Sequence, residues 1–347
     1  WDTPVNTVDA VYAFMKGNES NWSRKAPGIP ENEEQRLKSL YITGLLDTRD
    51  DERFERLTRL ARKAFQVPVA LISLLDRERQ WLLACQGVGV RETPRDISFC
   101  GHAILQEGPF IIHDAAADAR FHDNPLVTGE PHIRFYAGQP VSLPDGTVAG
   151  TLCLIHTVPR AFTDEDIASL RDLACIVEDE FEAISMAMTD SLTGIPNRRG
   201  FYRAGEKLFR AMNRQDASFS LIYFDLDRFK PVNDLWGHAE GDEVLKIFAG
   251  FLHQHLEPGE IAGRLGGDEF AALIRRNGNT QSYLHALSAS LDHYNDTSGK
   301  PYNINYSFGE LINNADHYTT LAEMIGKCDE VMYLKKKRKT LSRKTEP

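Results

Sequence analysis

The sequence predicts two α/β domains of the α+β type, joined by one long helix. The chain has 347 residues, which is enough for two domains that each bury a core. Short apolar runs alternate with segments of helical periodicity in both halves, and this alternation indicates sheets covered by helices. Between the halves, residues 161–189 keep a helical apolar repeat, so we expect a connecting helix there.

Composition narrows the classes of function. Charged residues make up 26% of the chain and hydrophobic residues 42%, which is typical of a soluble globular protein. The formal net charge is −10, whereas a surface that tracks nucleic-acid phosphates is basic, so no nucleic-acid partner is expected. No run of 18 apolar residues occurs, so we expect no membrane span in this chain.

The cysteines indicate a reducing environment. The chain has five, and no two of them form a Cys-x-x-Cys pair, so neither a disulfide framework nor a zinc site is expected. A cytoplasmic location fits this pattern best. The cysteines are Cys85, Cys100, Cys153, Cys175 and Cys328.

The N-terminal half begins with a polar extension or linker, residues 1–30, in which we expect a short helix near 8–15. A domain follows over residues 31–160. Its periodicity predicts a mixed sheet with flanking helices, and Asp145-Gly146 predicts a hairpin turn between the last two strands. The expected order is helix 52–64, strand 69–75, strand 81–85, helix 102–106, strand 110–113, strand 133–141 and strand 150–155.

Several phrases of this domain resemble the GAF family. The resemblance implies a sensor domain that binds a small molecule or dimerises, and its ligand stays unknown. Bilin attachment at Cys100 beside His102 and haem bound by a histidine are alternatives, but a buried free cysteine is the ordinary interpretation. The phrases are 69–76 (VALISLLD), 98–104 (SFCGHAI), 123–127 (DNPLV), 133–138 (IRFYAG) and 150–155 (GTLCLI).

Residues 161–189 are expected to form a signalling helix. Thr163 can cap its start, and the acidic residues that follow favour the positive end of the helix dipole. Apolar residues then recur at alternating spacings of three and four, which is a heptad seam. One interpretation packs this seam on the chain's own N-terminal domain; we favour the other, a parallel two-stranded coiled coil with a second chain. The seam is Ile167, Leu170, Ala174, Val177, Phe181, Ile184 and Met188.

The C-terminal half carries carboxylates in two places next to apolar strands. Residues 219–224 are short, apolar and aromatic, as expected for a buried strand, and Asp225 follows them. Gly266-Gly267 predicts a tight hairpin turn, with Asp268 and Glu269 directly after it. Adjacent carboxylates offer hard oxygen ligands for Mg²⁺ beside a nucleotide phosphate. A helix is expected over 242–250, where apolar residues have helical spacing.

Together with 190–199 (DSLTGIPNRR), these blocks resemble the GGDEF family of diguanylate cyclases over about residues 186–340. The resemblance implies a domain at 190–340, followed by a tail at 341–347. Its fold would be like nucleotidyl cyclases and polymerase palms, with a mostly antiparallel sheet surrounded by helices. It also implies that two GTP molecules become cyclic di-GMP and two pyrophosphates, each 3′-hydroxyl attacking the other α-phosphate across a homodimer formed through the GAF domain and the coiled coil.

The family's metal and catalytic positions are all filled. The resemblance implies two Mg²⁺ or Mn²⁺ ions at Asp225 and Asp268, with the backbone carbonyl of Leu226 as a further ligand. Glu269 matches the family's general base and is also a candidate metal ligand. Two metals about 3.5–4 Å apart would bridge the phosphates and activate the hydroxyl.

Basic residues match the family's phosphate contacts. Arg228, Phe229 and Lys230 match a short loop whose backbone N–H groups cradle the phosphates, which is an anion nest. Lys335 matches a later phosphate-binding lysine. Lys339 stands where the family usually has arginine, and it lacks the planar fork of that residue.

Guanine recognition is implied at Asn233 and Asp242. A carboxylate accepts from guanine N1–H and the exocyclic amine, donors that adenine lacks, so Asp242 favours GTP over ATP. His238 is a candidate nucleoside contact, although stabilising the loop is as good an interpretation. We expect Arg264 to brace the glycine turn rather than to touch the substrate.

One departure from the family concerns product inhibition. Many members carry an Arg-x-x-Asp site just before the glycine turn, whereas this chain has Glu257 and Glu260 at the matching positions. A glutamate at 257 would repel the product's phosphates, so we expect the primary inhibitory site to be absent.

Two alternatives stay open for the whole chain. One is a catalytically silent receptor that binds GTP or cyclic di-GMP and signals by protein contact; the retained carboxylates argue against it. The other is an enzyme that makes an adenine-containing cyclic dinucleotide, for which a serine at 242 would be expected rather than the aspartate.

Overall fold

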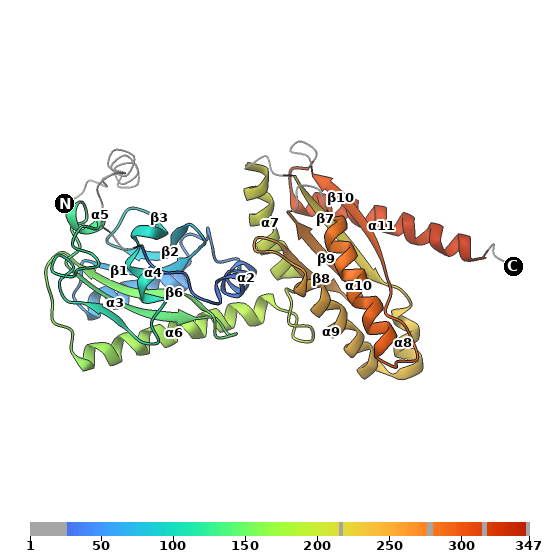
Figure 1. Ribbon diagram of the computed structural model, residues 1–347, viewed down its shortest axis with the longest axis horizontal. Helices are drawn as coiled ribbons and strands as arrows, with labels where there is room; N and C mark the ends of the chain where they lie inside the picture. The colour runs from blue at the N-terminus through green and yellow to red at the C-terminus, as the bar shows by residue number, and fades with distance from the viewer. Residues whose placement is uncertain (1–25, 215–217, 276–279, 314–317, 345–347) are drawn as a thin grey trace. The chain divides into compact units, whose positions relative to one another are not determined.

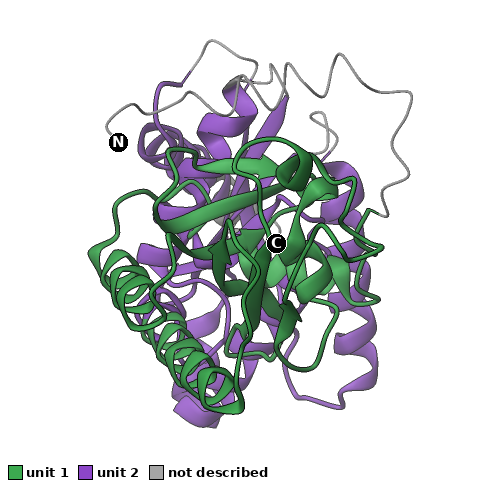
Figure 2. Ribbon diagram, turned by 90° about the vertical axis from the view of Figure 1, so that its left-hand side faces the viewer, with its two compact units in different colours: residues 1–40, 45–183 green, residues 41–44, 184–347 purple. Residues whose placement is uncertain are grey.

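The computed structural model describes residues 26–214, 218–275, 280–313 and 318–344 (Figure 1). The helix expected near 8–15 lies outside these residues. The chain divides into two compact units at Ala183 and Ile184, with residues 41–44 assigned to the second unit (Figure 2). Both units contain a sheet and helices, so the expected mixed α/β class is confirmed. Among the described residues, no helix combines the length and apolar character that crossing a membrane requires.

The first unit is built on a six-stranded antiparallel sheet with the order β3-β2-β1-β6-β5-β4. The strands are β1 (Val69–Leu75), β2 (Arg79–Gln86), β3 (Glu92–Pro94), β4 (Phe110–Ile112), β5 (Phe135–Ser142) and β6 (Val148–His156). The helices are α2 (Glu33–Thr43), α3 (Glu52–Ala64), the 3₁₀ turn η1 (Arg95–Ile97), α4 (Phe99–Ala103) and α5 (Pro125–Thr128).

Both faces of this sheet are covered. Every residue of β1 is buried, since α3 packs on one face and α4 on the other. The expected hairpin turn forms at Asp145-Gly146, where Gly146 has φ +82°. The helix expected at 102–106 begins earlier, at Phe99, because the Ser98 hydroxyl accepts from the Gly101 N–H (3.0 Å) and caps it there.

The long helix α6 (Asp164–Met188) forms as expected, but its seam is used within the chain. The Phe181 ring lies against that of Phe54 on α3, with centroids 5.6 Å apart and the ring planes tilted by 50°. Glu178 accepts from the Ser142 N–H at the end of β5 (2.7 Å). The coiled coil expected through this seam is therefore corrected to an amphipathic helix packed on its own domain. The buried seam residues of the first unit are Leu170, Ala174, Val177 and Phe181, while Ile184 and Met188, which are also buried, belong to the second unit.

The second unit has a four-stranded antiparallel sheet with the order β10-β7-β9-β8, in agreement with the mostly antiparallel sheet that was expected. The strands are β7 (Phe219–Leu226), β8 (Ile261–Gly266), β9 (Glu269–Ile274) and β10 (Tyr306–Asn313). The helices are α7 (Arg198–Arg214), α8 (Phe229–Trp236), α9 (His238–Gln254), α10 (Gln281–Thr297) and α11 (Leu321–Lys344).

Alternate side chains of β7 pack into two hydrophobic cores, one on each face of this sheet. Phe224 packs with α9 and α10 residues such as Phe248 and Leu287, and Tyr223 packs with α7 and α11 residues. The helix expected from Asp242 begins at His238 instead, because Gly237 takes φ +89° and turns the chain sharply after α8.

Candidate nucleotide and metal site

The β8–β9 hairpin is held in shape by Arg264. Its Nε and Nη2 donate to the carbonyl oxygen of Gly267 (3.0 and 2.8 Å), and Nη1 donates to both carboxylate oxygens of Asp190 (3.2 and 3.1 Å). Gly267 itself has φ +33°. These bonds confirm that Arg264 braces the turn, and they tie the turn to the 190–199 block.

Sheet register brings the two carboxylate positions together. Asp225 at the end of β7 is paired directly with Glu269 at the start of β9. The Leu226 N–H donates to the carbonyl oxygen of Asp268 (3.2 Å), which places the hairpin tip beside the end of β7. The structure therefore gathers Asp225, Leu226, Asp268 and Glu269 at one end of the sheet.

Burial and mutual repulsion govern the charges of these carboxylates. Burial raises the pKa of Asp225, and the nearby carboxylates of Asp268 and Asp227 raise it further, against the opposing effect of Lys336. Burial likewise raises the pKa of Glu269, and its acidic neighbours add to this, while a hydrogen bond from the Tyr223 hydroxyl opposes the shift. A cation at this place would relieve both effects.

Among the residues that the structure describes, no group of three or more histidine, cysteine, aspartate or glutamate side chains is close enough together to hold a metal ion. The Lys336 ammonium lies against the Asp225 carboxylate instead. The oxygen donors and the repulsion among them suit a hard cation such as Mg²⁺, and the lysine supplies the positive charge in this arrangement.

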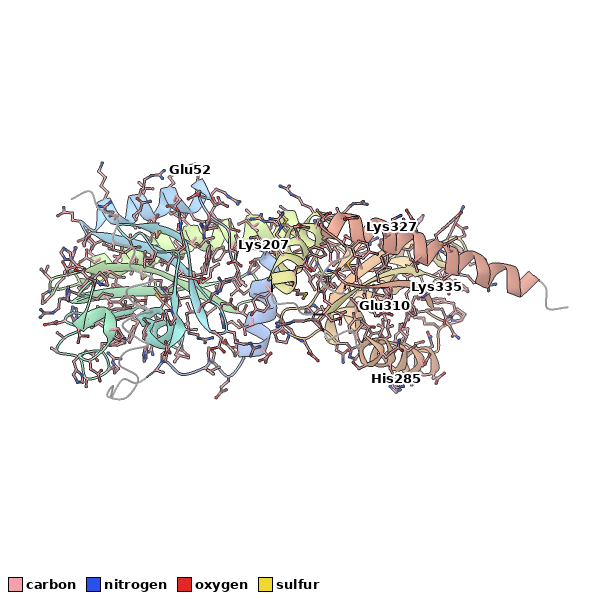
Figure 3. All side chains as sticks on the ribbon, turned by 90° about the horizontal axis from the view of Figure 1, so that it is seen from above. Glu52, Lys207, His285, Glu310, Lys327 and Lys335 are labelled. Atoms are coloured by element: carbon pink, nitrogen blue, oxygen red, sulfur yellow. The ribbon has the colours of Figure 1, made fainter. Side chains whose placement is uncertain are left out.

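Lys336 is a site residue that the sequence analysis missed. Lys335, the expected phosphate contact, is labelled in Figure 3. Its ammonium lies over the Phe308 ring, 5.0 Å from the ring centroid. Helical periodicity could have identified Lys336 from the sequence. Cys328 and Met332 lie on the buried face of α11, and Lys336 is the next residue on that face. The side chain of Lys339 lies outside the described part of α11.

The loop after β7 leads into α8 through a left-handed residue. Arg228 has φ +60° and ψ +28°, and α8 begins at Phe229. The Asp227 N–H donates to the Asn305 carbonyl (2.8 Å), which fixes the strand end before the turn. Phe229 packs on the core while Arg228 and Lys230 are exposed, so both cations are accessible from solvent in the segment after β7.

The expected guanine contacts lie at the corner between α8 and α9. Asn233 approaches Gly241 so closely that a Cβ at 241 would lie 2.0 Å from its Oδ1, so a larger residue there would displace the Asn233 amide. Asp242 and His238 are exposed on the first turns of α9, next to this corner.

Two further residues brace the same corner and were not predicted from sequence. The Tyr302 hydroxyl donates to Glu240 (2.5 Å), and Lys300 forms an ion pair with the same carboxylate. The Tyr302 ring also lies 5.0 Å from that of Trp236 at the end of α8. The loop before β10 thus holds the start of α9 in place.

At the matching positions of the family's inhibitory site, the two glutamates differ in environment. Glu260 is 6% exposed and accepts from the backbone N–H groups of Glu257 (2.8 Å) and Arg275 (3.0 Å). Glu257 is exposed. Glu260 therefore has a structural role in the turn before β8.

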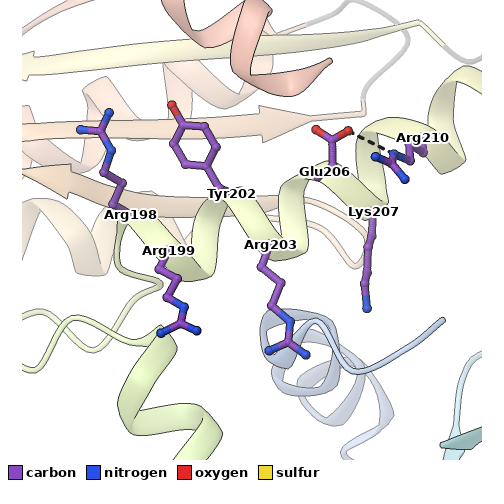
Figure 4. Close-up of a pocket in the computed structure, with 7 residues that line it drawn as sticks. All are labelled: Arg198, Arg199, Tyr202, Arg203, Glu206, Lys207 and Arg210. Atoms are coloured by element: carbon purple, nitrogen blue, oxygen red, sulfur yellow. Dashed lines mark hydrogen bonds and ion pairs between the residues drawn. The ribbon is translucent and has the colours of Figure 1, made fainter. Parts of the chain in front are cut away.

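A shallow basic pocket runs along α7. Figure 4 shows Arg199, Arg203 and Lys207 extending from the same side of the helix, while Glu206 forms an ion pair with Arg210 (3.1 Å). The sequence analysis did not single out this pocket. Its lining residues are Arg198, Arg199, Tyr202, Arg203, Glu206, Lys207 and Arg210.

Family models identify both domains. The model described as "Diguanylate cyclase, GGDEF domain" matches residues 187–341, and the model described as "GAF domain" matches residues 51–178. The chain thus contains a GAF domain followed by a GGDEF domain, as the sequence motifs predicted, and it is related to proteins of cyclic di-GMP signalling.

Two curated relatives carry contrasting names. The chain is 41% identical over 202 residues to a protein of Pseudomonas aeruginosa named a cyclic di-GMP phosphodiesterase, covering 58% of this chain and 34% of that protein. It is 34% identical over 161 residues to diguanylate cyclase DgcP of Escherichia coli, covering 42% of this chain and 47% of that protein. The chain therefore spans between a third and a half of these relatives' lengths.

A solved structure of the GGDEF domain alone of TpbB (YfiN) from Pseudomonas aeruginosa also aligns with this chain. The alignment covers 43% of this chain and 89% of that chain, at 30% sequence identity and a TM-score of 0.40.

Proposed function

We propose that the chain is a diguanylate cyclase, which condenses two GTP molecules into cyclic di-GMP and releases two pyrophosphates. The observation that carries this proposal is the register of β7 and β9, which sets Asp225 opposite Glu269 and brings Asp268 beside them. The E. coli relative's name agrees with this activity.

The residues divide into three tasks. Asp225, Asp268 and the Leu226 carbonyl would hold two Mg²⁺ or Mn²⁺ ions, which supply Lewis-acid stabilisation of the phosphates when bound. Glu269 removes the proton from the attacking 3′-hydroxyl; its raised pKa suits a general base. The carboxylates also repel any anion that arrives without a cation.

Phosphate and base contacts come from the surrounding loops. Lys336, which pairs with Asp225 in the structure, would leave that carboxylate and contact the triphosphate in place of Lys335. Arg228 and Lys230 would add positive charge from the segment after β7. The exposed carboxylate of Asp242 accepts from the guanine edge, and Asn233 and His238 stand beside it. Positioning and charge neutralisation then account for most of the acceleration.

Reaction at both ends of the product requires two such sites, so the active form is a homodimer that binds one GTP per chain. Because the α6 seam is occupied within the chain, dimerisation uses other surfaces of the GAF domain and of α6, whose outer face exposes Ile176 and Met186.

The test is turnover of GTP with Mg²⁺ by the purified chain, with cyclic di-GMP and pyrophosphate measured together. We expect product from the wild type, and a loss of about 10²–10⁴-fold in kcat for Glu269→Gln, since a general base contributes that much. Asp268→Asn should be equally impaired, whereas Asp296→Asn, an exposed carboxylate on α10, should match the wild type.

Absence of product from a dimer that still binds GTP would contradict the proposal and favour a silent receptor. Cleavage of added cyclic di-GMP, the activity named for the Pseudomonas relative, would contradict it as well.

A further inference from the structure

The core of the GAF domain holds two cysteine thiols in contact, and the proposed cyclase reaction uses neither. Cys100 lies on α4 and Cys153 lies on β6, with their Sγ atoms 3.7 Å apart. The two residues are 2% and 0% exposed. The sulfur atoms must approach by about 1.7 Å to reach the disulfide bond length of about 2.05 Å.

Strand register brings a tyrosine hydroxyl to the same point. Tyr136 and Gly138 lie on one face of β5, and Gly138 pairs across the sheet with Cys153. A Cβ at 138 would lie 2.2 Å from the Tyr136 hydroxyl oxygen, so the glycine makes room for the ring. The hydroxyl then donates to Cys100 Sγ (3.2 Å).

The environments of the two thiols shift their pKa values in opposite directions. Burial raises the pKa of Cys100, but hydrogen bonds from Cys153, Ser73, Thr151 and Tyr136 outweigh it and lower this pKa to about 6. The pKa of Cys153 is raised well above its usual range, first by its hydrogen bond to Cys100 and then by burial. One thiolate beside one thiol is the arrangement of an attacking and a resolving cysteine.

The remaining cysteines lack this arrangement. Cys328 is buried and donates to the Gly309 carbonyl (3.2 Å), and burial raises its pKa to about 12. Burial also raises the pKa of Cys85, while Cys175 is exposed on α6. These three serve as internal controls.

We propose that Cys100 and Cys153 form a reversible disulfide when the protein meets a hydroperoxide, which makes the GAF domain an oxidant-responsive module. The Cys100 thiolate attacks the peroxide's terminal oxygen, the O–O bond breaks, and the departing oxygen takes up a proton and leaves as an alcohol, or as water from H₂O₂. Cys100 is then a sulfenic acid. The Cys153 sulfur attacks it, the S–O bond breaks, and water leaves with the thiol proton. Two thiols lose two electrons, which reduce the peroxide.

The test uses the full reduced chain, exposed to H₂O₂ at neutral pH, denatured, alkylated and mapped by mass spectrometry. We expect one peptide pair joined through Cys100 and Cys153, restored to free thiols by dithiothreitol, with Cys328 still alkylated. The Cys175→Ser variant should give the same pair. Full alkylation of both Cys100 and Cys153 after a treatment that oxidises Cys175 would overturn the proposal, and so would their joining only to other cysteines.

Two variants separate the steps. In Cys153→Ser the hydroxyl keeps a hydrogen-bond donor beside Cys100, but the sulfenic acid has no resolving thiol, so a dimedone adduct should accumulate at Cys100 and nowhere else in the core. Adding Tyr136→Phe to that variant removes one donor and should move the pH midpoint of adduct formation upward by about one unit. An unchanged midpoint, in a variant with the parent's circular dichroism spectrum, would contradict the role given to Tyr136.

Discussion

Adjacent lysines on α11 meet different surroundings because successive residues of a helix point about 100° apart. Lys336 continues the buried face of α11 and reaches Asp225, whereas Lys335 turns to the Phe308 ring. A motif comparison that is shifted by one residue therefore selects the other side chain. The structure shows that the Lys336 ammonium lies against the Asp225 carboxylate.

Replacing these lysines one at a time tests this assignment. Lys336→Ala should lower kcat/KM for GTP by about 10- to 100-fold, because a charge-assisted contact contributes about 1.5–3 kcal/mol. Lys335→Ala should change it less than about threefold, since the ammonium of Lys335 lies over the half-buried Phe308 ring and not against a carboxylate. Steady-state kinetics decides, and a larger effect from Lys335→Ala would restore the assignment made from the sequence.

A buried ion cluster makes the GAF domain sensitive to acid. Glu33 accepts from Arg36 (2.7 and 2.9 Å) and is also paired with Arg95. Burial alone would raise the pKa of Glu33, but the two arginines lower it from 4.5 to about 2. Because the folded pKa is lower, this carboxylate stabilises the fold above about pH 4.5, and the contribution disappears as the pH falls toward 2.

Acid titration of stability tests this cluster. The shift corresponds to a contribution on the order of 3 kcal/mol at neutral pH, and Glu33→Gln should lose about 3–5 kcal/mol because it leaves two arginines buried without a counter-charge. Urea unfolding at pH 7 and pH 4 measures the free energy of unfolding of the wild type and of Glu33→Gln. Glu52→Gln, which removes an exposed pair with Arg59, is the matched control and should leave the free energy of unfolding nearly unchanged. Equal losses in the two variants would refute the role of burial.

At the scale of the element, α6 shows why a heptad spacing is ambiguous. Residues at spacings of three and four form one apolar stripe, and such a stripe packs equally well on a second helix or on a sheet-and-helix layer. The structure gives the stripe to α3 and the first sheet, through contacts such as the ring pair of Phe181 and Phe54. The spacing of the apolar residues alone does not determine which surface the stripe packs on.

Because the seam packs within the chain, substitutions of two apolar residues of α6 should differ in their effect on the free energy of unfolding. Phe181→Ala should lower the free energy of unfolding by about 3–5 kcal/mol, because the ring is 1% exposed. Ile176→Ala should lower it by less than about 1 kcal/mol, since its side chain is 42% exposed. Both losses should be independent of protein concentration; a loss for Phe181→Ala that vanishes on dilution would instead indicate a seam between chains.

At the scale of the whole molecule, each chain brings one set of carboxylates, whereas the proposed reaction forms two phosphodiester bonds. Specific activity should therefore rise with protein concentration until the dimer is saturated. Parallel sedimentation and turnover measurements over one dilution series would test this. Constant specific activity from a chain that sediments as a monomer would rule out the two-chain site.

What the sequence by itself determined is the identity of the parts. Motifs such as Gly266-Gly267-Asp268-Glu269 and the strand before Asp225 have a local physical meaning, since glycine permits the turn and an apolar run forms the strand. From these, the two domains, the carboxylate site and the bracing role of Arg264 were predicted. Two helices begin earlier than predicted, because the Ser98 cap starts α4 and the turn at Gly237 starts α9.

Only the tertiary structure decided which distant groups meet. Three contacts join residues that are far apart along the chain. They are the packing of the α6 seam on its own domain, the pair of Lys336 with Asp225, and the contact of Cys100 with Cys153. Their pairing depends on sheet register and helix rotation, and a shift of one residue in either changes the partner. Local sequence patterns specify the elements, while the packing of those elements sets these contacts.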